Sequence, residues 1–198
     1  MNHGIINIIM IKHLDKDCGS QLNVELNHSE GVNMDKLNDL ISDYQHQLQK
    51  GTIQKAYREI LGFISGLKVH LKRKYPEYQV SGLYQGYMDM TYFSFTPAEL
   101  KERNLKIALV YLHEENRFEA WLSAVNRSVA EEYIQKLKDF DDMGYMISKT
   151  PLDVDYITTR ILTDSPDFDD PKKLTEEIEI RSLSFIRSMT DLVDHVPK

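Results

Sequence analysis

The sequence predicts an α+β domain in which an antiparallel sheet of three to four strands packs against long helices, in the order ααβββαβαα. Apolar residues recur at spacings of three and four over residues 37–75 and again over 171–193, which is typical of amphipathic helices. Between these segments, residues 82–125 contain strand-like runs with period-two alternation or continuous apolar character. Separate blocks of helices and strands indicate the α+β class.

The first expected helix begins after Met34, extends over about four turns and has one apolar stripe, made of Leu37, Leu40, Ile41, Tyr44 and Leu48. Gly51 follows it, at the position of a left-handed C-terminal cap. A longer second helix is expected from Thr52, as its N-cap, to the residue before Pro76. Gly62 and Gly66 each cost this helix roughly 1 kcal/mol, so we expect another element to approach it closely there.

Three strands are expected next, over Gly82–Phe95, Leu105–Leu112 and Arg117–Val125. Pro97 opens a short turn or helix between the first two strands, and residues 113–116 form a four-residue hairpin loop between the last two. The remaining chain is expected to hold a helix over 126–140, a short strand over 144–148, a short helix over 153–163 and a final helix that begins at Asp170 and Pro171.

The N-terminal segment differs from the rest of the chain. Residues 1–33 combine a short apolar burst with polar and Gly-containing runs, so we expect either a disordered leader or an extension upstream of the true start. The codons for residues 30–32 can spell a purine-rich initiation signal just ahead of Met34, which favours Met34 as the start. Residues 34–198 are then expected to form a single α+β domain. The apolar run is too short for a membrane span and lacks a signal-peptide cleavage site.

Composition limits the classes of function. Twenty-four basic against 31 acidic residues give a net charge of −7, which argues against general nucleic-acid binding. The single Cys18 excludes an internal disulfide and suits a reducing cytoplasm, where we expect this protein to reside. The sequence contains no Gly-rich phosphate loop, no nucleophile elbow and no Cys–His pair, so the common hydrolase and nucleotide-binding classes are disfavoured.

Two carboxylates lie inside aromatic, strand-like runs and need an explanation. Asp89 and Glu119 would each cost several kcal/mol in an apolar strand unless paired, hydrogen-bonded, metal-bound or exposed. Together with Lys106 they are the candidate catalytic residues of an alternative function, a metal-dependent nuclease or phosphodiesterase with a degenerate restriction-endonuclease-like site. That alternative requires Mg²⁺ or Mn²⁺ held by Asp89 and Glu119. Otherwise no cofactor is expected, and Glu119 pairs with Arg117 or Lys106.

The favoured function is binding of a small molecule or of a protein. Aromatic residues in the strands exceed what one packed sheet face requires, so some are expected to line a groove or an oligomer interface, and a homo-oligomer is one alternative. The candidate binding residues are Tyr87, Tyr92, Tyr111, His113, Arg117 and Trp121. No partner can be named from these residues.

The segments Tyr84–Phe93, Lys106–Ala108, Arg117–Leu122 and Asp167–Phe168 carry a family resemblance. The chain resembles a bacterial family of small proteins of unknown function, over about Met34 to Val193. The resemblance implies a bacterial protein that begins near Met34, and it implies no activity, cofactor or catalytic residue. The order of elements is also similar to that of restriction-endonuclease-like folds, which is weak support for an enzyme.

Overall fold

The structure is a computed structural model that describes residues 36–137, 146–147 and 156–195. The expected leader over 1–33 therefore lies outside the described residues, as does part of each element expected over 126–163. The described elements follow in this order: α2 (Leu37–Lys50), α3 (Thr52–Lys74), β1 (Gln79–Val80), β2 (Met90–Thr96), α4 (Ala98–Glu102), β3 (Leu105–Leu112), β4 (Arg117–Ala124), α5 (Arg127–Leu137), β5 (Met146–Ile147), β6 (Thr158–Asp164) and α6 (Pro171–Asp194).

The strands form one antiparallel sheet in the order β1-β2-β3-β4-β6-β5. The α+β class and the antiparallel meander of β2, β3 and β4 are confirmed, and β3 has the expected bounds. The expected three to four strands were too few, because β6 adds a long strand beside β4, and the two-residue strands β1 and β5 lie at the edges.

The helix expected over 153–163 is wrong from residue 158 onward, where the chain forms β6. This segment is rich in β-branched residues (Thr158, Thr159, Ile161 and Thr163), which are stiff at χ1 and fit a pleated surface. It also pairs with the otherwise open edge of β4, from Leu122 against Thr158 to Arg117 against Asp164, with a bulge between Phe118 and Glu119. Strand pairing with β4 therefore determines the conformation of this segment.

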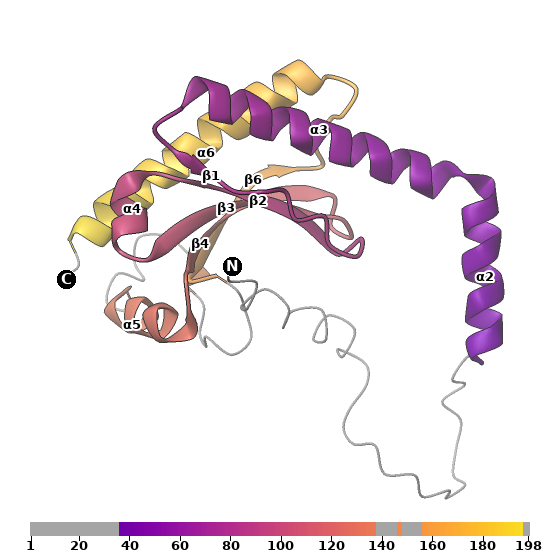
Figure 1. The fold of residues 1–198 in the computed structure, drawn as a ribbon, viewed down its shortest axis with the longest axis horizontal. Coiled ribbons are helices and arrows are strands. Elements are labelled where there is room, and N and C mark those ends of the chain that lie inside the picture. Colours follow the sequence, from indigo (N-terminus) through magenta and orange to yellow (C-terminus); the bar gives the residue numbers. More distant parts are fainter. Residues whose placement is uncertain (1–35, 138–145, 148–155, 196–198) are drawn as a thin grey trace, which may run out of the picture.

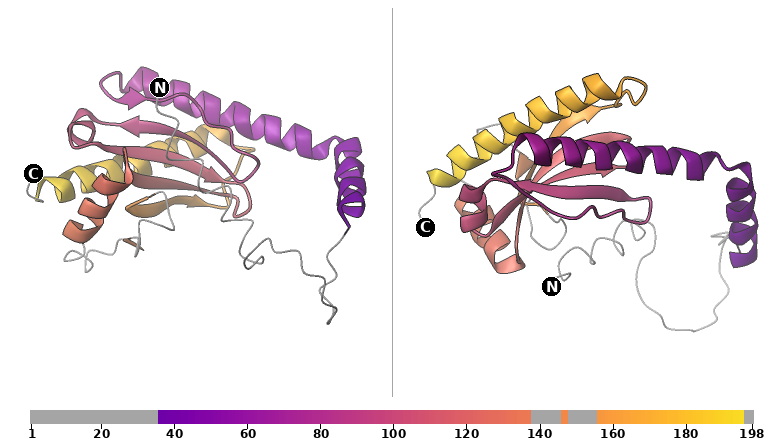
Figure 2. Two further views of the ribbon diagram at one scale, coloured as in Figure 1. Left: turned by 60° about the horizontal axis from the view of Figure 1, so that its bottom comes forward. Right: turned by 45° about the horizontal axis from the view of Figure 1, so that its top comes forward.

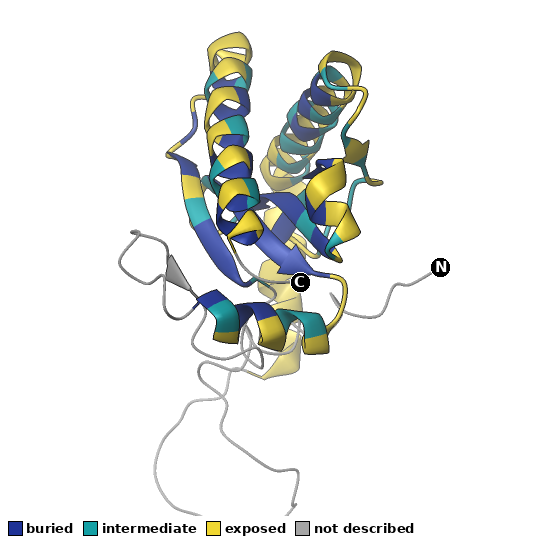
Figure 3. Ribbon diagram, turned by 90° about the vertical axis from the view of Figure 1, so that its left-hand side faces the viewer, coloured by how far each residue is buried: buried dark blue, intermediate teal, exposed yellow. Residues whose placement is uncertain are grey.

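Helices α3 and α6 lie side by side on one face of the sheet (Figures 1 and 2). Their inward sides are buried and their outward sides exposed (Figure 3). Alternate residues of the strands, among them Phe93, Phe95, Ile107, Leu109 and Phe118, meet these helices in the main core. The α3 residues in this core are Ile64, Leu67 and Leu71. The expected cap of α6 is confirmed, because the Asp170 carboxylate accepts a hydrogen bond from the Lys173 amide at 3.1 Å.

The close approach expected at Gly62 and Gly66 is wrong. A Cβ atom added at either glycine would have no neighbour within 4 Å, and both residues are exposed on the outer side of α3. Their cost to the helix is therefore not offset by packing in the described part of the chain.

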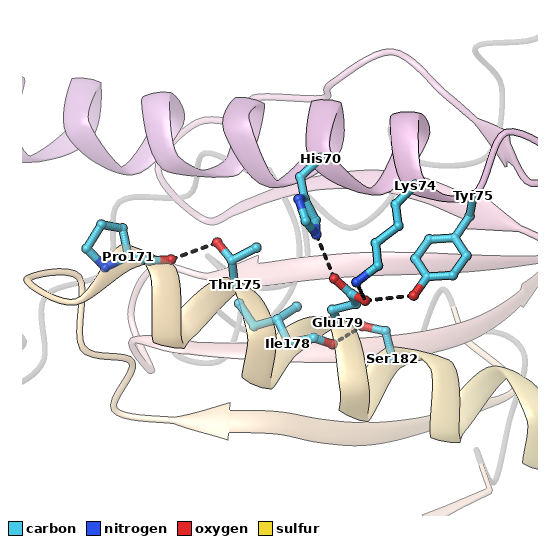
Figure 4. Close-up of polar contacts among 8 residues, drawn as sticks. All are labelled: His70, Lys74, Tyr75, Pro171, Thr175, Ile178, Glu179 and Ser182. Atoms are coloured by element: carbon cyan, nitrogen blue, oxygen red, sulfur yellow. Dashed lines mark hydrogen bonds and ion pairs between the residues drawn. The ribbon is translucent and has the colours of Figure 1, made fainter.

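An ionic cluster around one buried carboxylate joins α3 to α6 (Figure 4). Glu179 of α6 is 6% exposed, and it accepts hydrogen bonds from Lys74 Nζ and Tyr75 Oη, both at 2.6 Å on Oε1. His70 Nε2 lies 2.6 Å from Oε2. Both carboxylate oxygens are thus paired, which a buried charge requires. The cluster fixes the two helices against each other.

Helix α2 stands away from this body (Figures 1 and 2). Gly51 turns the chain with φ of 71°, and its amide donates to the Leu48 carbonyl, so the expected left-handed cap is confirmed. Thr52 is the first residue of α3 rather than its cap. No residue of α2 is buried. None of the helices in the described ranges combines the length and apolarity needed to cross a bilayer.

Candidate functional site

The second face of the sheet, opposite α3 and α6, carries the candidate site. Along β4, Phe118, Ala120 and Leu122 point into the main core, so the alternate residues Arg117, Glu119 and Trp121 point to the other face. On that face Trp121 packs with Met90, Ala108 and Val110, against the partly buried residues Tyr92, Leu112 and Tyr156. No residue of a described helix belongs to this second cluster.

Glu119 lies at the centre of the site and is only 4% exposed. Its Oε1 accepts a hydrogen bond from Arg117 Nε at 2.7 Å. Its Oε2 accepts hydrogen bonds from Trp121 Nε1 at 2.6 Å and from Thr159 Oγ1 of β6 at 2.9 Å. Three donors therefore compensate for the lost hydration of this carboxylate. The expected pairing of Glu119 is with Arg117 rather than with Lys106.

Aromatic rings flank the carboxylate. The rings of Trp121 and Tyr156 lie 5.0 Å apart between centroids. Burial raises the pKa of the Tyr156 phenol, the Glu119 charge raises it further, and the Arg117 charge opposes this. Tyr156 thus stays a neutral phenol near the ion pair at ordinary pH. Tyr92 stacks with Tyr84 on the β2 side, with ring centroids 4.9 Å apart.

Arg117 lies at the rim of the site, where β4 begins. Its side chain is 30% exposed, against 6% for the Glu119 side chain with which it pairs. The pairing uses Nε, and a guanidinium carries four more N–H donors on its terminal nitrogens. The Glu119 carboxylate therefore fixes the orientation of the Arg117 guanidinium through Nε. The edge of the guanidinium that carries the terminal nitrogens is directed away from Glu119.

A second polar cluster surrounds Asp89. The strand expected from Gly82 begins only at Met90, so Asp89 lies in the loop before β2 and not in a strand. The Asp89 carboxylate accepts a hydrogen bond from the Tyr87 amide at 2.8 Å, within a turn where Gly86 and Met88 have φ of 65° and 66°. The backbone carbonyl of Asp89 accepts a hydrogen bond from the His113 amide at 2.9 Å.

His113 lies between aromatic rings. Its centroid is 5.4 Å from that of Tyr57 and 4.8 Å from that of Tyr111, and its Nε2 is 2.9 Å from Thr91 Oγ1. Burial lowers the pKa of this imidazole, with partial opposition from the Asp89 charge. His113 therefore favours its neutral form and acts as part of the hairpin packing.

The structure does not bring Asp89, Lys106 and Glu119 together. Glu119 pairs with Val110, four residues along β3 from Lys106, which corresponds to about 13 Å. Asp89 is two strands across and three residues along from Glu119, on the order of 14 Å between Cα atoms. Within the described residues, no three His, Cys, Asp or Glu side chains are placed to hold a metal ion. The nuclease hypothesis stays an untested prediction without a specific observation in its favour.

The six candidate binding residues separate into four places. Tyr92, Arg117 and Trp121 share the second face. Tyr111 faces the main core, where its hydroxyl donates to Asn116 Oδ1 at 2.8 Å. His113 is in the hairpin, and Tyr87 is 75% exposed on the loop before β2.

Sequence reasoning missed Thr159 and Tyr156, which complete the site. Both fall in the segment that was expected to be helical. The run of β-branched residues from Thr158 to Thr163 was the signal that could have identified a strand there, and with it a donor for Glu119.

Comparison with known proteins identifies the family. The profile of a domain of unknown function, DUF7000, matches residues 37–193, from the first residue of α2 to the penultimate residue of α6. The chain belongs to the DUF7000 family. Searches of curated proteins and of solved structures each gave no match. The expected membership in a family of unknown function is thus confirmed, and the DUF7000 match contains both α2 and every residue of the candidate site.

Proposed function

We propose that this DUF7000 chain is a ligand-binding domain whose site is the second sheet face around Arg117, Glu119 and Trp121, and that its ligand is a small aromatic carboxylate. The observation that carries the proposal is a partly exposed guanidinium held by a buried carboxylate at the edge of an aromatic cluster.

The ion pair is poorly explained by stability alone. A buried ion pair contributes little net stability compared with apolar residues of similar volume, because both charges lose hydration. Glu119 nevertheless uses both oxygens and three donors beside the apolar cluster of this face. Fixing the orientation of Arg117 is a use for which such an arrangement is suited, since preorganised polar groups bind ligands at lower entropic cost.

The chemistry of the rim indicates the class of ligand. The planar guanidinium fork matches a carboxylate through two parallel N–H···O hydrogen bonds. The ring of Tyr156 is only partly buried and packs on the buried Trp121, so it offers a flat apolar surface to an aromatic group. Apolar walls with a few convergent polar groups are typical of small-molecule sites.

Trp121 makes the proposal directly testable, because it is the single tryptophan of the chain. Titration with benzoate is expected to change Trp121 fluorescence saturably, and uncharged benzamide is expected to bind at least tenfold more weakly because it lacks the second carboxylate oxygen. Arg117→Lys keeps the charge but loses the fork, so it is expected to weaken benzoate binding about tenfold.

Arg187→Lys, on an exposed position of α6, is the matched control and should bind benzoate as the wild type does. Equal responses to benzoate and benzamide, or equal affinities in the two arginine variants, would contradict the proposal. Thermal unfolding of each variant without ligand would show that the fold is retained.

A further inference from the structure

Helix α2 presents an apolar stripe to solvent. Leu37, Leu40, Ile41 and Tyr44 are 70%, 50%, 42% and 64% exposed, and they lie on one side of the helix because their spacing is three and four residues. Ile53, in the first turn of α3, is 39% exposed and extends this surface beyond the Gly51 turn. Large apolar side chains gathered in this way indicate an interaction surface.

The described residues of one chain do not explain the stripe. No residue of α2 is buried, and the helix stands away from the sheet and from α6 (Figures 1 and 2). The DUF7000 match nevertheless begins at Leu37, so α2 is part of the family domain. An amphipathic helix that contributes nothing to its own core needs another apolar surface to be stable in water.

The spacing of the stripe suits a second copy of the same helix. A two-fold interface requires a patch that complements itself. Four of the five apolar residues on this side of α2, at positions 37, 41, 44 and 48, are separated by four, three and four positions, and this spacing is the same from either end. In an antiparallel pair, Leu37 lies beside Leu48 of the second copy, and Ile41 lies beside Tyr44 of the second copy. Antiparallel pairing also opposes the two helix dipoles favourably.

The charges of α2 do not oppose this pairing. At 3.6 residues per turn, the charged residues Asp39, Asp43 and Lys50 lie on the side of the helix away from the stripe, as does His46. The positions that flank the stripe carry the amides of Asn38, Gln45 and Gln47. A second copy therefore meets uncharged polar side chains at the rim of the contact, where like charges would have been repulsive.

We infer that two copies of this chain associate through antiparallel pairing of their α2 helices, with the apolar stripe of Leu37, Leu40, Ile41 and Tyr44 as the contact. A 14-residue helix is about 21 Å long, so the contact is smaller than the usual interface of about 800 Å² per partner. The dimer is accordingly reversible, with a dissociation constant in the micromolar range.

Sedimentation equilibrium of the full chain at about 1–500 μM tests the inference. The average mass is expected to rise from 23.1 kDa towards twice that value as the concentration increases. The double variant Leu40→Glu/Ile41→Glu places charge in the stripe and should remain monomeric over the whole range. Ser42→Glu adds a charge on the opposite side of the same exposed helix and should dimerise as the wild type does.

Cross-linking tests the orientation in a Cys18→Ser background. Oxidation of a mixture of Leu37→Cys and Leu48→Cys chains, one carrying a size tag, should give mainly the mixed disulfide. A monomer at every concentration, a dimer that the stripe variant leaves intact, or preferential self-linking of Leu37→Cys would each overturn the inference. None of these outcomes depends on ligand binding at the sheet face.

Discussion

Two buried carboxylates, Glu119 and Glu179, occupy opposite faces of the same sheet and are stabilised in the same way. Each meets three donors from side chains, and in each case a cation is among them. Glu179 of α6 accepts hydrogen bonds from α3 and so joins two helices far apart in sequence. Glu119 instead accepts hydrogen bonds from residues of its own strand and of the adjacent strand β6. The contacts of Glu179 therefore stabilise the packing of the two helices, whereas those of Glu119 hold the Arg117 guanidinium at the surface.

The ionisation of Glu179 makes stability dependent on pH. Burial alone would raise its pKa, but hydrogen bonds from Lys74, Tyr75 and His70 and the Lys74 charge outweigh burial and lower the pKa from 4.5 to about 2. Because the folded-state pKa is below the unfolded value, the stabilisation is fully present above pH 4.5 and is lost as the pH falls towards 2. Its size is roughly 3 kcal/mol.

We expect Glu179→Gln to lower the free energy of unfolding at pH 7, and the difference from wild type to narrow by roughly 2 kcal/mol between pH 7 and pH 3. Urea unfolding at several pH values measures this. Glu176→Gln, at an exposed position of the same helix, should leave the pH dependence of the wild type unchanged. A pH-independent difference would show that the ionisation of Glu179 is not the cause.

Alanine substitution should change the free energy of unfolding in opposite directions at Gly86 and at Gly66. Gly86 has φ of 65°, and a Cβ there would clash with the Met90 carbonyl oxygen, so Gly86→Ala should destabilise by more than about 1 kcal/mol. Gly66 is within α3 with open space around it, so Gly66→Ala should stabilise by about 0.5–1 kcal/mol. Chemical denaturation of both variants checks the signs, and a destabilised Gly66→Ala would contradict the open packing.

At the scale of elements, α2 and α3 differ although their sequence patterns are alike. Both are amphipathic, but α3 buries Ile64, Leu67 and Leu71 beneath the core, while α2 buries nothing. Helical structure in α2 is therefore expected to unfold independently of the body, since local stability follows local burial.

Ile41→Pro tests this independence. Proline in the middle of α2 removes a helical hydrogen bond and should abolish the helix, which would lower the far-ultraviolet circular dichroism signal. The free energy of unfolding of the body, followed by Trp121 fluorescence, should change by less than about 0.5 kcal/mol. Leu67→Pro in α3 is the contrasting variant and should prevent folding. A large loss of body stability in Ile41→Pro would show that α2 contributes to the core.

Helices with long apolar stripes and the meander were predictable from sequence, because their periodicity extends over many residues. The cap at Gly51, the end of α3 before Pro76 and the start of α6 at Asp170 were predictable from local backbone chemistry. The strand β6 was not, since its stability depends on the free edge of β4, which is a partner 40 residues away in sequence. The same limitation applies to the role of Gly62 and Gly66, whose surroundings depend on helix placement.

At the scale of the whole molecule, the sheet has α3 and α6 on one face and the candidate site on the other. Sequence identified Arg117, Glu119 and Trp121 as notable but could not assign their face, because a single bulge or shift in register reverses it. A bulge does occur beside Glu119, between β4 and β6. Thr159 and Tyr156 became part of the site only through that pairing, so the composition of the site is a property of the assembled sheet.

The position of α6 late in the chain has a consequence for protein synthesis. The strand β2 carries Phe93 and Phe95 of the main core, to which α6 also contributes, yet α6 begins about 75 residues after β2 ends. At roughly 5–20 residues per second, a ribosome takes on the order of ten seconds to make that interval. During this time the apolar face of the nascent sheet is not yet covered by α6. A chaperone that binds exposed aromatic strands would therefore bind this chain before α6 has been synthesised.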